Sequence, residues 1–463
     1  MKLKVGYLPL YIKLYDDDDP HMRDPMVAYM DHLIAELGLR GLDIVQAPVC
    51  RIKEEFDAAA EMLNASGVCA VITQNLAYSP SLESIEALLS LKVPQVILDT
   101  TPDFDMYDTA DTYNGIDPNH GIHGVQDMCS MLKRNGRAYT LCVGHEKNSD
   151  VLDQVVSACR AAAIAEAFRS AKVGTAGGSF DGMGDFLISA DDLKRLTGAE
   201  IVTLTKEEAA SYEATVTPEE IEEVIARDRA DFVWEVKNEE YYRTQVRASL
   251  VLRKWIEAQS LTAATVNFLK TEECGLPTMP FVECSRMMAR GIGYAGEGDV
   301  LTAAFVGALM KVYGTEAAFT EMFCPDWKNS LLLLSHMGEA NLAQSCRQPI
   351  LRDEPFPYNS YGHTAAAYVC MKPGKAVLVN LAPMGERISM VLSPVEMVGV
   401  SSEHSAYRYA EEGWLKPVKP LGQFLKEFSE LGGTHHSALV YGADLNELAA
   451  FGKMMNFSVS VIQ

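Results

Sequence analysis

Short apolar segments alternate with longer amphipathic segments over roughly the first 170 positions of the chain. The short segments predict strands, and the longer ones, whose apolar positions recur with helical spacing, predict helices. The predicted strands cover residues 5–11, 42–49, 68–73, 95–99 and 138–143, and the predicted helices cover residues 26–39, 54–63, 82–91, 124–133 and 151–168. Because helices join successive strands, the strands are expected to be parallel, in an open doubly wound sheet. Ligands bind such sheets beyond the carboxyl ends of the strands.

The pattern changes twice further along the chain. A second α/β unit begins near residue 172 and includes charged helices, one of which is expected to start at Thr217-Pro218-Glu219-Glu220. After about residue 365, short apolar segments separated by proline–glycine turns predict antiparallel strands. The predicted architecture is two doubly wound α/β domains, of the Rossmann or flavodoxin type, followed by a C-terminal antiparallel β-barrel-type domain. The predicted domains cover residues 1–170, 171–316 and 317–463.

Composition and charge narrow the classes of partner. The 463 residues are 48% hydrophobic and 22% charged, as in an ordinary globular chain with an ample core. The 63 acidic against 40 basic residues give a formal charge of −23, so neither nucleic acid nor a membrane is an expected partner. No apolar run approaches the ~20 residues of a membrane span, and the start of the chain lacks a secretory signal pattern. The ten cysteines are scattered without a C-x-x-C pair, which favours reduced thiols in a cytoplasmic protein.

A glycine-rich segment precedes the first candidate carboxylate. Gly291–Gly296 matches G-x-G-x-x-G, but the residues before it read as a helix, whereas a dinucleotide fingerprint needs a strand there. A nicotinamide oxidoreductase is therefore a minor alternative. Glu297 follows the glycines directly, where a ligand can approach it closely. Asp299 is expected to cap the helix that follows.

Three further segments carry polar side chains among apolar or glycine residues. Glu321 lies between large apolar residues, His336 follows the apolar run 331–334, and His435 and His436 follow a glycine pair. Each has a plain structural explanation by itself, such as an exposed acid or a hydrogen-bonded core histidine. Together with Glu297, one residue from each of these segments gives two carboxylates and two imidazoles, a ligand set that suits a six-coordinate divalent ion such as Mn²⁺ better than Zn²⁺.

Four segments resemble the L-arabinose isomerases of the L-fucose/L-arabinose isomerase superfamily, in the order and with nearly the spacing of that family. They are Arg290–Asp299, Phe319–Met322, Ser335–Met337 and Gly432–His436. The resemblance implies two α/β domains followed by a β-barrel-type domain. It implies that Glu297, Glu321, His336 and His436 bind a divalent metal ion and that the two glutamates also transfer the proton. His120, His123, Met183 and His435 are the sugar-contacting residues that it implies.

The function implied by the resemblance is a metal-dependent aldose–ketose isomerase. The expected reaction is L-arabinose to L-ribulose, with D-galactose to D-tagatose as a second reaction, through a metal-stabilised cis-enediolate. One ion per site is expected, Mn²⁺ first and Co²⁺ or Mg²⁺ as alternatives, without a nucleotide cofactor. The family also implies a cytoplasmic homo-oligomer, a hexamer with its active site at a subunit interface.

Departures from the family pattern leave the sugar open. Residues 9–15 replace the usual glutamine-bearing loop, Lys270 stands where the family has a phenylalanine, and His120 stands where a glutamine is usual. An isomerase of an L-fucose-like, branched or acidic sugar is therefore an alternative. A non-catalytic sugar-binding protein is a second alternative, because paired α/β domains also serve that purpose.

Overall fold

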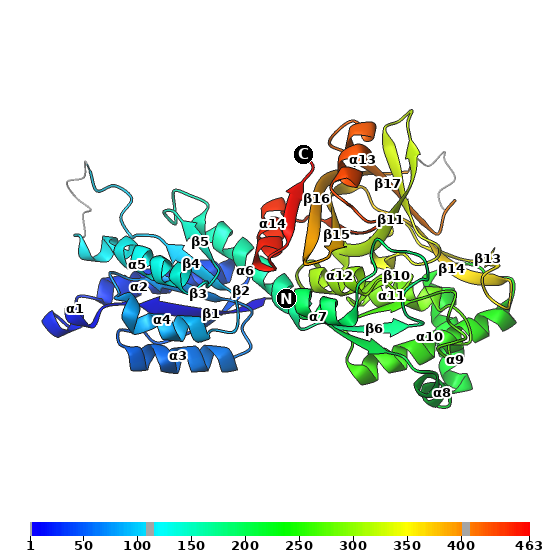
Figure 1. Ribbon diagram of the computed structural model, residues 1–463, viewed down its shortest axis with the longest axis horizontal. Helices are drawn as coiled ribbons and strands as arrows, with labels where there is room; N and C mark the ends of the chain where they lie inside the picture. Colours follow the sequence, from blue (N-terminus) through cyan, green and yellow to red (C-terminus); the bar gives the residue numbers. More distant parts are fainter. Residues whose placement is uncertain (1, 108–114, 401–407) are drawn as a thin grey trace. The chain divides into compact units, whose positions relative to one another are not determined.

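The computed structural model describes residues 2–107, 115–400 and 408–463. Its chain divides into two compact units, Met1–Glu166 and Ala167–Gln463, and each unit contains a parallel sheet (Figure 1). Among the residues that the structure describes, none of the helices combines the length and the apolar character needed to cross a membrane.

The N-terminal unit is a five-stranded parallel sheet with the order β2-β1-β3-β4-β5. Its strands are β1 (Leu3–Leu10), β2 (Leu42–Gln46), β3 (Val71–Asn75), β4 (Gln95–Asp99) and β5 (Tyr139–Val143). Its helices are α1 (Lys13–Asp18), α2 (Asp24–Leu39), α3 (Lys53–Ala65), α4 (Ser81–Ser90), the 3₁₀ turn η1 (Asp117–Asn119), α5 (Gly121–Arg134) and α6 (Val151–Arg169), which runs past the end of the unit. The predicted doubly wound α/β sheet is confirmed, and its strand order is that of flavodoxin-like folds.

Burial explains why the central strands are continuous apolar runs. Every residue of β3 and of β4 is buried, because helices cover both faces of a parallel sheet. On one face, α3, α4 and α5 contribute Phe56, Ile85 and Val125 to a core shared with Leu8 and Ile97 of the strands. The helices predicted at residues 54–63, 82–91 and 124–133 are confirmed, and their apolar side chains face the sheet.

The second unit begins with a four-stranded parallel sheet of order β10-β9-β6-β7. Its strands are β6 (Lys172–Ala176), β7 (Glu200–Thr203), β9 (Ala263–Val266) and β10 (Gly293–Gly296). The helices around it are α7 (Ala190–Thr197), α8 (Lys206–Glu213), α9 (Pro218–Asp231), α10 (Glu239–Gln259), α11 (Phe281–Ala289) and α12 (Val300–Tyr313). The predicted helix start is confirmed, because Thr217 and Glu220 form a reciprocal capping box at the beginning of α9.

The remaining strands form one ten-stranded sheet, part of which closes into a barrel. The strands are β8 (Val233–Glu235), β11 (Ala317–Asp326), β12 (Leu331–Ser335), β13 (Ile350–Pro355), β14 (His363–Cys370), β15 (Gly374–Met384), β16 (Arg387–Val398), β17 (Glu411–Pro417), β18 (His436–Tyr441) and β19 (Ser458–Val461). The helical segments here are η2 (Gly314–Glu316), η3 (Leu342–Gln344), α13 (Leu421–Glu430) and α14 (Leu445–Met454). The order β16-β15-β18-β11-β12-β17 closes because β17 also pairs with β16. The predicted barrel-type domain is confirmed.

One helix connects the parallel sheet to the barrel. α12 leaves the end of β10, packs against β11 and β18, and leads through η2 into β11 (Figure 1). This packing holds the turn between β10 and α12 close to the outer surface of two barrel strands. The division of the chain into three domains at residues 170 and 316 stays a prediction.

Candidate active site

Strand pairing brings three of the predicted side chains together. Glu321 on β11 pairs directly with His436 on β18, and on its other side it pairs with Ser335, the last residue of β12. His336 follows Ser335 immediately. Cross-strand neighbours lie about 4.5–5.5 Å apart at their Cβ atoms, so the register places the carboxylate beside the His436 imidazole, and His336 reaches it from the turn directly after β12.

Glu297 reaches the same place from the turn before α12. Its φ of 61° is in the left-handed region, which a residue other than glycine rarely adopts. The next residue, Gly298, has a φ of 83°, and a Cβ atom there would lie 2.1 Å from the carbonyl oxygen of Gly178. Strained backbone of this kind persists where the surrounding structure holds it, and it is concentrated at functional sites.

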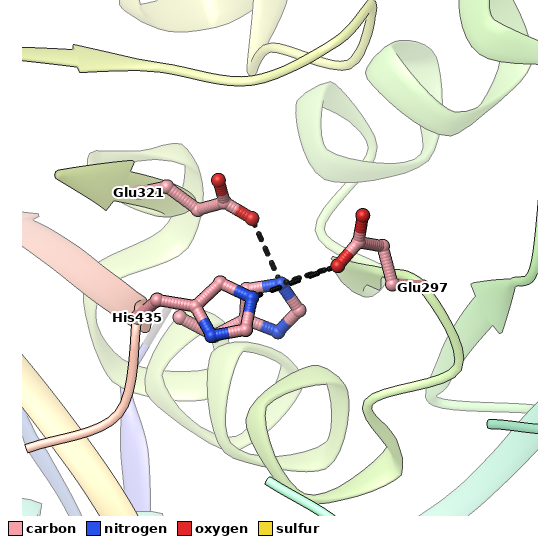
Figure 2. Close-up of side chains that lie close together, drawn as sticks. Glu297, Glu321 and His435 are labelled. Carbon is pink, nitrogen blue, oxygen red and sulfur yellow. Dashed lines mark ion pairs between the residues drawn. The ribbon is translucent and has the colours of Figure 1, made fainter. Parts of the chain in front are cut away.

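The distances show how tightly the groups converge. His436 Nε2 lies 2.9 Å from Glu321 Oε1 and 3.5 Å from Glu297 Oε2. His336 Nε2 lies 3.2 Å from the same Glu321 oxygen. Figure 2 shows the carboxylates of Glu297 and Glu321 directed toward the histidine rings from opposite sides. The side chains of Glu297, His336 and His436 are more than nine-tenths buried, and that of Glu321 is 11% exposed.

Each of the two buried imidazoles is oriented by a second carboxylate. Asp299 Oδ2 lies 2.9 Å from His436 Nδ1, and Glu339 Oε2 lies 2.6 Å from His336 Nδ1. Tyr294 donates a hydrogen bond of 2.5 Å to the other oxygen of Glu339. A carboxylate at Nδ1 holds a proton on that nitrogen, so it is Nε2 that gives up its proton when the ring is neutral and presents its lone pair to the cluster.

Mutual ion pairing governs the ionisation of the four groups. Burial raises the pKa of Glu297, but ion pairs with His435 and His436 outweigh it and lower this pKa to about 2. Burial also raises the pKa of Glu321, and the charges of His336 and His436 bring it well below its usual range. Burial lowers the pKa of His436, but Asp299 and the two glutamates raise it to about 10. The charges of Glu339 and Glu321 likewise outweigh burial and raise the pKa of His336.

His435 lies at the edge of the cluster rather than inside it. Its side chain is 38% exposed, and its Nε2 is 3.6 Å from Glu297 Oε2 (Figure 2). Its Nδ1 is 2.6 Å from Asp185 Oδ2, which also accepts a hydrogen bond of 3.0 Å from the backbone N–H of His435. Met183, a predicted sugar contact, is in the same loop as Asp185. Phe186 of this loop stacks on the His436 ring, with centroids 4.6 Å apart.

The donor atoms fit a divalent metal ion. One ligand atom each from Glu297, Glu321, His435 and His436 lie within 4.8 Å of one another. Oε2 of Glu297 and Nε2 of His336 and His436 are buried and make no hydrogen bond of normal geometry with the described residues. Buried polar atoms seldom lack a partner, and two carboxylates with imidazole nitrogens are ligands that a divalent transition metal prefers. This group contains His435, which the sequence predicted as a sugar contact. As found among the described residues, it does not include the predicted ligand His336, whose Nε2 nevertheless lies 3.2 Å from Glu321 Oε1.

Two of the predicted sugar contacts lie in the N-terminal unit. His120 and His123 are at the start of α5, with ring centroids 5.3 Å apart, and Tyr15 Oη is 3.3 Å from His120 Nε2. Nearby, the buried side chains of Asn75 and Ser79 have polar atoms that make no hydrogen bond within the described segments. This polar edge of the sheet is where doubly wound folds bind ligands.

Sequence reasoning missed several residues of the site. Asp299 was predicted only as a helix cap, a role confirmed by its bond with Thr302 N–H, and its contact with His436 was not foreseen. Glu339, Asp185 and Phe186 had no distinguishing pattern. The spacing of Glu339 three residues after His336 is the one signal that could have suggested a local partner.

Two family models match the chain: the central domain of L-arabinose isomerase over residues 192–316 and the C-terminal domain of L-arabinose isomerase over residues 316–458. Similar relatives include the L-arabinose isomerases of Thermotoga petrophila, Geobacillus kaustophilus and Aeromonas salmonicida. The Thermotoga protein is 24% identical over 90% of this chain and 86% of its own length. The Geobacillus protein is 26% identical over 88% of this chain and 84% of its own length. The Aeromonas protein is 24% identical over 91% of this chain and 86% of its own length.

Among solved structures, a periplasmic solute-binding protein of an ABC transporter from Actinobacillus succinogenes with bound D-allose matches with a TM-score of 0.18 and 12% identity. The match covers 67% of this chain and 92% of the solute-binding protein. A similarity this low supports no conclusion about fold or ligand.

The parallel sheets, the barrel, the carboxylate–imidazole cluster and these relatives together define a sugar isomerase. Because a sugar isomerase is an enzyme, the alternative of a non-catalytic sugar-binding protein is excluded. Within that class, the chain belongs to the L-arabinose isomerase family.

Proposed function

We propose that this chain is a metal-dependent aldose–ketose isomerase that converts L-arabinose to L-ribulose, with D-galactose to D-tagatose as a second reaction. The observation that carries the proposal is the convergence of Glu297, Glu321, His336 and His436, whose buried ligand atoms form ion pairs with one another but leave Glu297 Oε2 and both Nε2 atoms without a hydrogen bond to the described residues. The relatives that match most of the chain are L-arabinose isomerases, which supports the choice of sugar.

The proposed metal ligands are Glu297, Glu321, His336 and His436. His336 and His436 are preferred over His435 because a buried carboxylate holds Nδ1 of each and leaves Nε2 facing Glu321. A divalent ion, Mn²⁺ by preference and Co²⁺ or Mg²⁺ as alternatives, would supply a Lewis acid that lowers the energy of the negative charge developing on the sugar oxygens.

The two glutamates are the proposed proton-transfer groups. Isomerisation moves one proton between C1 and C2 of the sugar through a cis-enediolate, while the carbonyl and hydroxyl oxygens exchange character. Glu297 approaches the cluster from the turn before α12 and Glu321 approaches it from β11, so two carboxylates from different elements are available to a sugar bound at the proposed metal site. Such general acid–base catalysis contributes about 10²–10⁴-fold to a rate.

His435, Met183, His120 and His123 are the proposed sugar contacts. The exposed edge of His435 and its bond with Asp185 suit a residue that hydrogen-bonds a hydroxyl group at the mouth of a site. The resemblance also supports a homo-oligomer, a hexamer, which sedimentation of the purified protein would test, and the scattered cysteines support a cytoplasmic location.

An isomerase of an L-fucose-like, branched or acidic sugar is the second candidate. Lys270, which replaces the family's phenylalanine, forms an ion pair of 2.7 Å with Asp181 in the loop that carries Met183. A charged pair at this position alters the polarity of the surface next to the proposed sugar contacts. Ketose formation measured with L-arabinose, D-galactose, L-fucose and an acidic sugar would separate the two candidates.

The test of the mechanism uses Glu297→Gln and Glu321→Gln. Each variant keeps the size of the side chain but removes the proton acceptor, so we expect ketose formation to fall by at least about 10²-fold with little change in the melting temperature. Glu386→Gln, at an exposed ion pair with Arg195, is the matched control and should keep full activity. Full activity of either active-site variant, or of protein stripped of metal by a chelator, would contradict the proposal.

A further inference from the structure

Two cysteines far from each other in the sequence face one another on antiparallel segments. Ser345 and Met371 form an isolated antiparallel bridge, and the backbone N–H of Cys346 donates to the carbonyl oxygen of Cys370 at 2.8 Å. Cys346 therefore lies directly opposite Cys370. Directly opposite residues have Cβ atoms about 4.5–5.5 Å apart, and a disulfide needs about 3.5–4.5 Å. A small approach of the two segments is enough for a bond.

The two thiols differ in exposure. Cys370 is completely buried, whereas Cys346 is exposed. Burial, together with the neighbouring Cys346 thiol, raises the pKa of Cys370 to about 12. A reagent from solvent must therefore reach Cys346 first, and Cys370 can react only through it.

The connection that carries Cys346 also carries part of the candidate site. It begins at His336, continues through Glu339 and η3, and reaches Cys346 before β13 begins. Cys370 is the last residue of β14. A bond between the two sulfur atoms would tie this connection to a barrel strand and would restrict its opening.

We propose that Cys346 and Cys370 are a reversible redox site that forms an intramolecular disulfide by exchange with a low-molecular-weight disulfide such as oxidised glutathione. The inference is independent of the proposed isomerase reaction, because it depends only on the strand pairing and on the position of the two thiols.

The exchange balances without any other reactant. The Cys346 thiolate attacks one sulfur of the small disulfide, whose S–S bond breaks and releases the first small thiolate. Cys370 then loses its proton to solvent and attacks the Cys346 sulfur, which releases the second small thiolate. The two protein thiols lose two electrons and two protons, and the small disulfide is reduced to two thiols.

The test incubates the full chain with oxidised glutathione, alkylates the remaining thiols and identifies the linked peptides by mass spectrometry. We expect one cross-link, between Cys346 and Cys370, that dithiothreitol reverses. Because the bond closes a loop of about 25 residues, oxidation should also raise the melting temperature by roughly 5–10 °C.

Three variants make the result specific. Cys346→Ser should abolish the cross-link and leave Cys370 unreacted, and Cys370→Ser should stop at a glutathione adduct on Cys346. Cys324→Ser removes the other exposed cysteine and should cross-link like the wild type. The proposal is overturned if the wild-type protein, which needs no substitution to fold, accumulates the adduct on Cys346 or links Cys346 to another chain instead of to Cys370.

Discussion

Replacing Asp299 by asparagine tests whether this residue sets the proton position on His436. The carboxylate receives two hydrogen bonds of 2.9 Å, one from the backbone N–H of Thr302 and one from His436 Nδ1. In Asp299→Asn, the amide oxygen can keep the first bond, because asparagine also caps helices well. Its NH₂ group then faces Nδ1. Two donors cannot bond to each other, so the proton of His436 must move to Nε2, which faces Glu321.

The size of the effect follows from the lost bond. A buried hydrogen bond to a charged group is worth about 1.5–3 kcal/mol, and both side chains are completely buried. At about 1.4 kcal/mol per tenfold change in an equilibrium constant, metal affinity should fall by roughly 10- to 100-fold. This range agrees with typical losses when the outer partner of a metal-binding histidine is changed.

The assay is titration of metal-stripped protein with Mn²⁺, followed by calorimetry or by the electron paramagnetic resonance signal of the free ion. Unfolding in urea measures stability alongside. Because the helix cap is kept and the amide NH₂ can donate to Nδ1 once the proton has moved, the lost bond is partly replaced, and we expect the unfolding free energy to fall by no more than about 1.5 kcal/mol. Asp444→Asn is the matched control, because Asp444 caps α14 at an exposed position and should leave Mn²⁺ affinity unchanged.

The reasoning would be refuted by unchanged Mn²⁺ affinity in a folded Asp299→Asn variant. That result would mean that His436 presents the same nitrogen lone pair without its carboxylate partner. A parallel loss of affinity and of stability, matched by Asp299→Ala, would instead show that the residue acts only through the helix cap.

The other predictions concern the two histidine environments and a buried asparagine. His336→Asn should weaken Mn²⁺ binding by at least about tenfold. His435→Asn should mainly raise the KM for the sugar. Equal losses of Mn²⁺ affinity in the two variants would contradict the proposed ligand set. Asn380 is completely buried and donates to the carbonyl oxygens of Thr434 and His436, at 3.0 and 2.6 Å. Asn380→Ala should therefore cost about 3 kcal/mol in urea unfolding and weaken Mn²⁺ binding, and wild-type values for both would show that these bonds are dispensable.

The α/β part of the fold was predictable because its signals are local. The strand predicted at residues 95–99 coincides with β4, and the helix predicted from residue 151 begins there as α6. Most errors lie at element ends, but α1 (Lys13–Asp18) falls in a stretch for which no helix was predicted. The strand predicted at 42–49 ends at Gln46, and the helix predicted from residue 124 begins at Gly121, where Gly121 and Gly124 pack closely against Asn75.

The barrel was predictable as a class but not as a set of pairings. β17 begins with two adjacent buried acids, Glu411 and Glu412, which no pattern of alternating apolar residues would mark as a strand. Glu411 is tolerated because Thr320 donates a hydrogen bond of 2.8 Å to it from β11. Such a partner comes from another strand and is visible only after the sheet has formed.

The residues of the candidate site also fall into two groups: those that the sequence could single out and those that only the fold brings together. Glu297, His336 and His436 could be selected because glycines or an apolar run set them apart in the sequence. Glu321 could not be distinguished from an exposed acid, since its burial depends on β18 and on α12. Asp185 contacts His435 over a separation of 250 residues, which no local pattern encodes.

The register between β11 and β18 decides whether the site exists at all. Successive side chains on a strand point to opposite faces, so a slip of one residue would turn Glu321 into the barrel and present Thr320 in its place. The barrel interior opposes such a slip. Thr320 is tied there to Glu411, and Ser437, its partner on β18, lies within hydrogen-bonding distance of Asn380. A polar layer inside the barrel therefore fixes the register that brings Glu321 and His436 together on its outer surface.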